Sequence, residues 1–321
     1  MNVLSLFDGM SCGMIALDRL GIKVDNYYAS EIDKYAMQVS QANYPEIIQV
    51  GDITKLDLST LPKIDLVMGG SPCQGFSFAG KQLAFDDPRS MLFFEFHKAI
   101  SYLQPKYFLL ENVKMKKEYL DIISEYMGVE PIFINSSLVS AQSRQRYYWT
   151  NIPNVEQPEE RGVVLRDILE DQPQRIGKTS DKPQHIGTAV DVNGHDLLKR
   201  VYSPDGKSPT VNTCQGGNRE PKIVAGAWRG RYQEDGSVKQ KLHLNKQSKS
   251  YALTASFPHK MNFLTKDEVY WRKLTCRECE RLQTVPDNYT NHVSNSQRFK
   301  MLGNGWTIEV IAHILKNMEV N

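Results

Sequence analysis

Short apolar segments alternate with helical segments through the first 110 residues, and this alternation limits the possible folds more than any other feature of the chain. Each apolar run is directly followed by a glycine or a carboxylate residue. The expected strands are 2–7, 26–30, 47–50, 64–68 and 107–110, and the expected helices include 34–42 and 90–103. Strands that alternate with helices predict an α/β fold with a doubly wound, mostly parallel sheet.

The composition and the expected secondary structure change near residue 156. From there to about residue 261, proline, glycine, lysine, serine and threonine become frequent, and short β-like pieces replace the helices. The last stretch returns to helix, with Thr275 and Glu278 spaced like a helix cap. We therefore expect a first domain at 1–155, a smaller, irregular β-rich domain at 156–270, and a return to the first domain at 271–321.

Charge is distributed unevenly along the chain, although the formal net charge is only +2. Residues 1–150 carry a net charge of −3, whereas residues 151–321 carry +5. Within the second half, residues 172–263 hold 15 basic and 7 acidic residues together with four of the seven histidines. A solvated surface would explain such a segment, but a polyanion such as nucleic acid is its natural partner.

Composition excludes several classes of protein. The hydrophobic fraction of 40% and the charged fraction of 24% are ordinary for a globular protein. We find no apolar run long enough to cross a bilayer and no secretory signal at the N-terminus, so we expect a cytoplasmic protein without a membrane partner. Five cysteines without an export signal indicate reduced thiols, not a disulfide framework.

Residues with reactive side chains fall at or just after the expected strands. They are Asp8, Glu31, Asp52, Cys73 and Glu111. In doubly wound sheets the ligand lies beyond the carboxyl ends of the strands, where these residues would meet. The sequence therefore predicts a site at that edge of the sheet.

The loop at 7–13 (FDGMSCG) joins a strand to a helix, and Glu31 follows Gly9 by 22 positions. Glycines let backbone N–H groups approach a ligand, and an acidic residue after the next strand can bind ribose hydroxyls. The spacing is G-x-x-x-G and differs from the G-x-G-x-x-G of dinucleotide enzymes. It favours a nucleoside ligand without a pyrophosphate, such as S-adenosylmethionine, with a tight turn in an α/β core as the plainer alternative.

Three further segments carry candidate catalytic groups. In 69–77 (GGSPCQGFS), Cys73 follows Pro72 in the expected crevice and is a candidate nucleophile, or else a small buried side chain. The loop that follows, up to residue 90, suits a lid. Glu111 can donate a proton when it is protonated, although an isolated glutamate is more often a helix cap or part of an ion pair. Gln142, Arg144 and Arg146 would share one face if this segment is a strand.

The pair Cys276 and Cys279 resembles half a zinc site. A structural zinc ion needs four ligands, and the sequence contains no second Cys-x-x-Cys or His-x-x-x-His pair. The capped helix explains these two cysteines, and we expect no metal.

Six motifs in this order resemble the DNA (cytosine-5) methyltransferases, in their compact bacterial or phage form. The motifs are FDGMSCG at 7–13, GGSPCQGFS at 69–77, ENV at 111–113, QSRQR at 142–146, RKLTCRECERLQTVP at 272–286 and MLGNGW at 301–306. The first half is also similar to the catalytic domain of the animal de novo enzymes. The resemblance implies a Rossmann-like S-adenosylmethionine-dependent methyltransferase, with the segment 156–270 as its target-recognition domain.

The resemblance implies a reaction in which a cytosine is flipped out of a specific site in duplex DNA and methylated at carbon 5. The Cys73 thiolate would add to carbon 6, Glu111 would donate to ring N3, Arg146 would hold the O2 carbonyl, and Arg144 would hold a phosphate or support the loop. S-adenosylmethionine would be the methyl donor and S-adenosylhomocysteine the product. We expect a monomer, with a possible cognate restriction endonuclease that acts on the same site.

The resemblance also assigns binding residues. The implied cofactor contacts are Phe7, Gly9, Gly13, Glu31, Ile32, Asp52, Ile53, Leu92, Asn304 and Trp306. The DNA contacts suggested by the resemblance and by charge are Gln74, Ser77, Gln82, Arg89, Gly217, Arg219, Arg229 and Arg231. Residues 8 and 10–12 depart from the commoner Phe-Ala-Gly-x-Gly form of the loop.

Three alternatives remain open. A tRNA cytosine methyltransferase shares these motifs in one branch of the family, but the long basic insert after QSRQR favours DNA. A catalytically silent S-adenosylmethionine-binding regulator would not need Cys73, Glu111 and both arginines. A Rossmann oxidoreductase would have a different glycine spacing.

Overall fold

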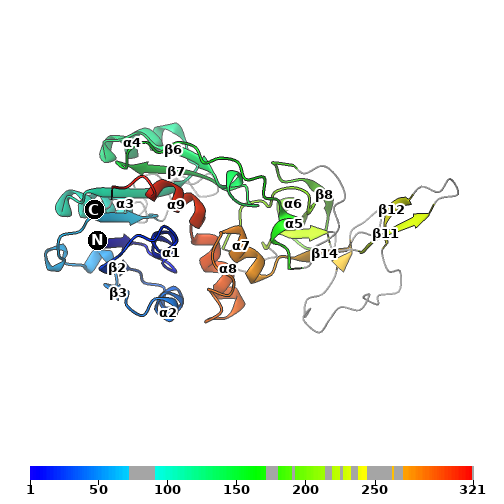
Figure 1. Cartoon of the computed structure of the whole chain (residues 1–321), viewed down its shortest axis with the longest axis horizontal. Helices are drawn as coiled ribbons and strands as arrows, with labels where there is room; N and C mark the ends of the chain where they lie inside the picture. The colour runs from blue at the N-terminus through cyan, green and yellow to red at the C-terminus, as the bar shows by residue number, and fades with distance from the viewer. Residues whose placement is uncertain are drawn as a thin grey trace.

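The computed structural model describes residues 1–71, 91–170, 180–189, 192–213, 219–224, 227–232, 238–243, 262–263 and 270–319 (Figure 1). The larger sheet has the strand order β3-β2-β1-β4-β5-β7-β6. Its strands are β1 (Asn2–Leu6), β2 (Asn26–Ser30), β3 (Ile48–Gln49), β4 (Leu66–Gly69), β5 (Tyr107–Val113), β6 (Ile132–Asn135) and β7 (Gln145–Thr150). Strands β1 to β5 pair in parallel, whereas β7 is antiparallel to both β5 and β6. The expected mostly parallel, doubly wound sheet is confirmed.

Both faces of this sheet are buried, because successive side chains of its central strands enter two different hydrophobic clusters. In β1, Val3 belongs to one cluster and Leu4 to the other. The helices α1 (Cys12–Arg19), α2 (Lys34–Asn43) and α9 (Ile308–Leu315) supply side chains to the first cluster. The helices α3 (Met91–Leu103) and α4 (Lys117–Met127) supply the second. Burial on both faces explains why the strands are nearly continuous apolar runs.

A second, five-stranded sheet lies at the other end of the molecule (Figure 1). It has the order β13-β14-β10-β9-β8, with the strands β8 (His185–Thr188), β9 (Arg200–Tyr202), β10 (Lys222–Val224), β13 (Asn262–Phe263) and β14 (Tyr270–Lys273). The strands β11 (Ala227–Tyr232) and β12 (Val238–His243) form a separate antiparallel pair. The short helices of this half are α5 (Leu165–Ile168) and α6 (Asp196–Lys199).

The chain returns to the larger sheet through α7 (Cys276–Leu282), α8 (Asn295–Asn304) and α9. The short 3-10 turns are η1 (Ile53–Lys55), η2 (Leu58–Thr60) and η4 (Ser136–Leu138). The first hydrophobic cluster extends past the expected boundary at residue 155, because it includes Leu165, Ile168 and Val211. The two halves are therefore joined by a continuous apolar core.

Several local predictions are confirmed. Strand β2 and helix α2 lie where the sequence places them, and Thr275 and Glu278 form a capping box at the start of α7. The expected strand through 142–146 is wrong in its first part, because β7 begins only at Gln145. Before that residue, Gln142 forms an isolated bridge to Ser208, and Arg144 stays beside the end of β6, where its N–H donates to Asn135 Oδ1.

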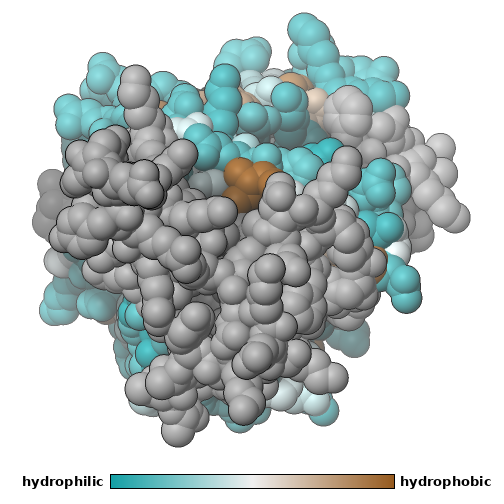
Figure 2. Space-filling view, turned by 90° about the vertical axis from the view of Figure 1, so that its right-hand side faces the viewer, coloured by the Kyte–Doolittle hydropathy of each residue, from teal (hydrophilic) through white to brown (hydrophobic). Residues whose placement is uncertain are grey.

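The described helices are all too short or too polar to span a lipid bilayer. Figure 2 looks onto the end of the molecule that carries β11 and β12. The described residues visible from this side are mostly hydrophilic, with a small hydrophobic group near the centre of the view.

Candidate active site

A cavity of about 390 Å³ opens beyond the carboxyl ends of β1, β2, β4 and β5. This is the edge of the sheet at which the sequence predicts a site. The cavity wall includes Phe7, Asp8, Gly9, Cys12, Ser30, Glu31, Ile32, Asp33, Asp52, Ile53, Ser71, Leu92, Glu111, Asn112, Arg144, Arg146, Met301, Asn304 and Trp306. Five of these residues are carboxylates and two are arginines, so the wall is predominantly acidic.

The loop between β1 and α1 has an unusual backbone. Phe7, Gly9 and Ser11 all have positive φ angles, of 56°, 61° and 62°. Phe7 and Ser11 are not glycines, so this conformation is strained and must be held by surrounding contacts. One such contact is the Glu31 carboxylate, which accepts hydrogen bonds from the N–H groups of Gly9 and Ile32 at 2.7 Å each. The residue that follows β2 thereby holds the loop in place.

Nine of the ten residues assigned to the cofactor by resemblance line this cavity: Phe7, Gly9, Glu31, Ile32, Asp52, Ile53, Leu92, Asn304 and Trp306. Gly13 does not line it. A Cβ atom at Gly13 would lie 2.5 Å from Met68 Cε, so this glycine allows α1 to approach β4 closely. The sequence assigns no role to the lining residues Asp33, Asn112 and Met301, although Asn112 and Met301 belong to the motifs at 111–113 and 301–306 and Asp33 follows Ile32.

Glu111 and Arg146 form an ion pair inside the cavity, with Arg146 Nε 2.8 Å from Glu111 Oε1. Strand register brings them together, because Arg146 in β7 lies opposite Val113, two residues from Glu111 in β5. Gly70 approaches this pair so closely that a Cβ atom there would lie 3.1 Å from Glu111 Oε2 and 2.9 Å from Trp306 Nε1. The segment leading to Pro72 and Cys73 thus begins against the carboxyl group and the indole.

Arg144 lines the cavity but directs its guanidinium into the protein. Its side chain donates to the carbonyl oxygens of Val211, Gly303 and Gly305. Burial and the nearby Arg146 lower the pKa of Arg144 to about 9. The guanidinium therefore ties the start of β7 to the second half of the chain and to the loop before Trp306. These contacts turn its Nη atoms away from solvent, and its role toward a phosphate or the loop stays a prediction.

Cys12 is a second thiol in the cavity wall. Burial raises its pKa to about 12, so it stays protonated near neutral pH. Nucleophilic cysteines act as thiolates, and Cys12 is therefore unsuited to that role.

Asp8 is a buried carboxyl group at the base of the cavity, where it accepts hydrogen bonds from Ser11 Oγ at 2.5 Å and Tyr27 Oη at 2.7 Å. Burial raises its pKa from 3.8 to about 6, despite these bonds. The folded protein consequently holds this proton more tightly than the unfolded chain does. Stability is lost as the pH rises from about 4 to 6, and the full cost of the charged form is present above pH 6.

We predict that Asp8→Asn is more stable than the wild type at pH 8 and that this advantage disappears toward pH 4. The shift from 3.8 to about 6 corresponds to about 3 kcal/mol. Urea unfolding between pH 4.5 and 8 measures the difference. Asp57→Asn is a control of opposite sign, because hydrogen bonds from Ser59 lower the pKa of Asp57. Parallel profiles for Asp8→Asn and the wild type would contradict the prediction.

Several predicted residues lie outside the described part of the chain: Cys73, Gln74, Ser77, Gln82, Arg89 and Gly217. Arg219 is described and exposed. Arg229 and Arg231 belong to β11, where their backbones pair with Lys241 and Lys239 of β12. This strand pair concentrates four basic residues in a short hairpin-like unit.

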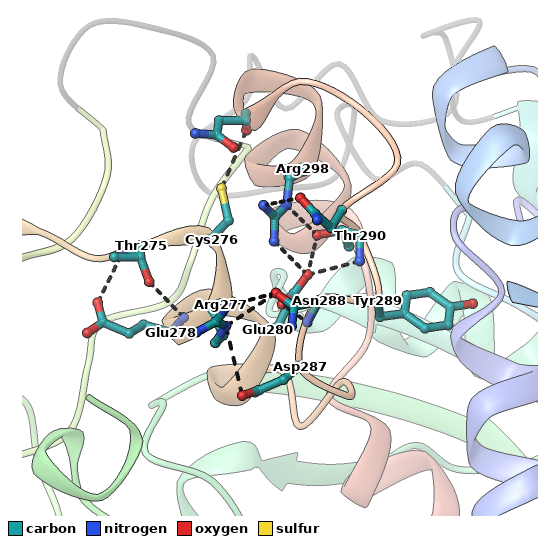
Figure 3. A network of polar contacts seen from close by, with 12 residues as sticks. Thr275, Cys276, Arg277, Glu278, Glu280, Asp287, Asn288, Tyr289, Thr290 and Arg298 are labelled. Carbon is teal, nitrogen blue, oxygen red and sulfur yellow. Dashed lines mark hydrogen bonds and ion pairs between the residues drawn. The ribbon is translucent and has the colours of Figure 1, made fainter. Parts of the chain in front are cut away.

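Cys276 and Cys279 lie buried in α7, in the polar surroundings drawn in Figure 3. Cys276 Sγ contacts the Asn295 carbonyl. Among the described residues, no group of three or more His, Cys, Asp or Glu side chains could hold a metal ion. The capped-helix interpretation of this motif is confirmed by the capping box at Thr275.

The fold is of the Rossmann-like type, and solved structures of methyltransferases have it too. The methyltransferase EhMeth of Entamoeba histolytica superposes with a TM-score of 0.68 and 16% identity, over 99% of this chain and 97% of that one. The Dnmt2 methyltransferase of S. pombe superposes with a TM-score of 0.65 and 18% identity, over 98% of this chain and 97% of that one. The sequence then specifies the family. The profile of the C-5 cytosine-specific DNA methylases matches residues 1–320, and the chain belongs to that family of DNA cytosine-5 methyltransferases.

Curated relatives include bacterial and phage enzymes. The type II methyltransferase M1.ScrFI of Lactococcus lactis subsp. cremoris is 30% identical over 92% of this chain and 72% of its own length. M.HhaI of Haemophilus parahaemolyticus is 28% identical over 99% and 94%. The orphan methyltransferase M.SPBetaI of Bacillus phage SPbeta is 28% identical over 99% and 97%. The predicted resemblance to bacterial and phage enzymes is confirmed.

Proposed function

We propose that this enzyme transfers a methyl group from S-adenosylmethionine to carbon 5 of a cytosine flipped out of a specific site in duplex DNA, through a covalent bond between Cys73 and carbon 6. The observation that carries the proposal is one cavity wall. It combines the Glu111–Arg146 pair, the residues leading into Cys73 and the set of residues assigned to the cofactor.

The cavity residues suit S-adenosylmethionine. When bound, this cofactor supplies an electrophilic methyl group on a positively charged sulfonium. The acidic wall favours a cationic ligand, and Phe7 and Trp306 offer aromatic surface to an adenine ring. Glu31 presents carboxylate oxygens beside the loop for ribose hydroxyls. No metal enters the proposal.

The chain's own residues account for the activation of the base. Carbon 5 of cytosine is a weak nucleophile, and addition of the Cys73 thiolate to carbon 6 makes it enamine-like. Glu111 would donate a proton to N3, so that negative charge does not build up on the ring, while Arg146 would hold the O2 carbonyl. After methylation, a base takes the proton from carbon 5, its electron pair re-forms the double bond to carbon 6 as the sulfur leaves, and N3 returns its proton to Glu111. This restores the aromatic ring and the free thiolate.

The Glu111–Arg146 ion pair positions both groups for this task, and Glu111 takes up a proton before it donates one to N3. It holds the carboxyl and guanidinium groups within 2.8 Å of each other, with side chains about one-tenth exposed. Because these side chains are largely buried, hydrogen bonds from them to a flipped-out base contribute more free energy than the same bonds would in water. The base must leave the duplex to enter this space, since a stacked cytosine could not reach it.

We infer that the second half of the chain reads the DNA and that Arg229 and Arg231 contact phosphates. Changing both to alanine should reduce the slope of log affinity against log salt by about 2, because each phosphate contact contributes about 0.9. Fluorescence anisotropy with duplex DNA over a series of NaCl concentrations measures the slope. Arg161→Ala is the control, since this exposed arginine pairs with Glu309 of α9. An unchanged slope would remove both residues from the DNA interface.

The overall proposal is tested by expressing the enzyme in a host without cytosine methylation and mapping 5-methylcytosine at base resolution. A single methylated sequence motif is the expected result, and a genome without one would overturn it. Methyl transfer to purified tRNA compared with duplex DNA separates the RNA alternative. Relatives named orphan methyltransferases occur beside relatives named type II methyltransferases, so we propose that methylation by this enzyme does not require a cognate endonuclease. That the enzyme acts as a monomer stays a prediction.

A further inference from the structure

The strained cofactor loop is contacted by a residue from the far end of the chain. Tyr289 is 6% exposed, and its hydroxyl donates a hydrogen bond of 2.8 Å to the carbonyl oxygen of Met10. Met10 stands between Gly9 and Cys12, which both line the cavity, whereas Tyr289 itself does not. Burial raises the pKa of Tyr289 well above its usual value, so the hydroxyl remains a donor throughout the working pH range.

The backbone on both sides of Tyr289 is clamped by one buried carboxylate. Glu280 is fully buried in α7 and accepts hydrogen bonds from the N–H groups of Asn288 at 2.7 Å and Thr290 at 2.9 Å. Arg298 of α8 neutralises this carboxylate through an ion pair of 3.0 Å. Figure 3 shows the network, with the Tyr289 ring pointing away from it toward the N-terminal helices.

Helix α2 adds a third restraint on the same residue. Asn43 Nδ2 donates to the Tyr289 carbonyl oxygen at 3.0 Å, and the Tyr289 ring packs beside that of Tyr44. Contacts from α7, α8 and α2 thus hold the backbone around Tyr289, the ring packs beside Tyr44, and the hydroxyl is directed at Met10. A residue held in this way can position the loop, because the Tyr289 side chain loses little conformational entropy when its hydroxyl bonds to Met10.

We propose that Tyr289 is a positioning residue for the cofactor loop, and that Glu280 acts through it. The Tyr289 hydroxyl holds Met10 so that the positive-φ backbone of residues 7–11 keeps the shape that receives the cofactor. This inference rests on the proposed binding of S-adenosylmethionine in the cavity. It makes cofactor affinity dependent on a segment that does not contact the cofactor.

The first experiment removes only the hydroxyl. Tyr289→Phe should weaken binding of S-adenosylhomocysteine, measured by calorimetry, about 3- to 10-fold, the range of one hydrogen bond. The KM for S-adenosylmethionine should rise by the same factor, with kcat at saturation and the KM for DNA within about twofold of the wild type. Hydrogen exchange of the Ser11 amide, which donates to the Asp8 carbonyl, should be faster in the variant.

Tyr44→Phe is the matched control. It removes a neighbouring tyrosine hydroxyl whose bond to Asp18 is long and exposed, and it should leave S-adenosylhomocysteine affinity unchanged. If the Tyr289 hydroxyl only stabilised the fold, Tyr289→Phe would lower the thermal stability without raising the KM for S-adenosylmethionine at an unchanged kcat.

A double-mutant cycle tests the role of Glu280. Glu280→Gln keeps the shape of the side chain, removes its charge and should weaken S-adenosylhomocysteine binding severalfold. In the Tyr289→Phe background the same change should have little further effect, since both act through one hydrogen bond. Full additivity would overturn the assignment of Glu280, and unchanged affinity in Tyr289→Phe would overturn that of Tyr289. Wild-type protein that fails to bind S-adenosylhomocysteine would overturn the proposed function itself.

Discussion

Replacing Cys73 by alanine should abolish methyl transfer, with kcat reduced by at least about 10⁴-fold. Without the thiolate, nothing adds to carbon 6 and carbon 5 stays a poor nucleophile. Binding of S-adenosylhomocysteine should persist, because Cys73 is not among the residues assigned to the cofactor. Transfer of tritiated methyl groups to duplex DNA measures the activity.

A duplex with 5-fluorocytosine at the target position tests the covalent step directly. Fluorine cannot leave carbon 5 as a proton does, so the bond between Cys73 and carbon 6 should persist in the wild type. A stable protein–DNA adduct is expected for the wild type and for Cys276→Ala, since Cys276 lies buried in α7 and is not part of the cavity wall. Cys73→Ala should form none. Methylation or adduct formation by Cys73→Ala would end the proposed mechanism.

Changing Glu111 to glutamine should lower kcat by about 10² to 10⁴, the usual contribution of a general acid. Glutamine keeps the size of the side chain and leaves a carbonyl oxygen beside Arg146. It cannot release a proton to N3 as the sulfur attacks. The loss should therefore appear in kcat, while the affinity for S-adenosylhomocysteine stays within a few-fold of the wild type.

Glu118→Gln is the control for Glu111. Glu118 stands on α4 and pairs with Lys116 at an exposed position. It should retain full activity in single-turnover assays with the same DNA. If Glu111→Gln kept more than about a tenth of the wild-type rate, proton donation by Glu111 would have to be abandoned.

Local patterns predicted much of the fold because they depend on neighbours in the sequence. The apolar run at 107–110 lies in strand β5, since buried parallel strands need continuous apolar side chains. Thr275 and Glu278 cap α7 because both reach backbone N–H groups within one helical turn. The antiparallel pair β6 and β7 was not foreseen, because strand direction depends on pairing between distant segments.

The motifs predicted the site for a related reason. Parallel strands deliver their carboxyl ends to one edge, so residues such as Glu31, Asp52 and Glu111 meet there whatever the details of packing. The sequence did not predict the direction in which each side chain points. Arg144 and Arg146 are two residues apart, yet one points to backbone carbonyls and the other to Glu111.

Sequence by itself determined the family of this protein, because six motifs that resemble those of the DNA (cytosine-5) methyltransferases stand in order along the chain, and each is a local pattern that can be read before the fold is known. The tertiary structure alone decided which polar groups work together. The carbonyl oxygens that hold Arg144 come from residues up to 161 positions away, and Tyr289 reaches Met10 across 279. Backbone carbonyls carry no sequence signature, so only the folded chain shows which side chains they bind.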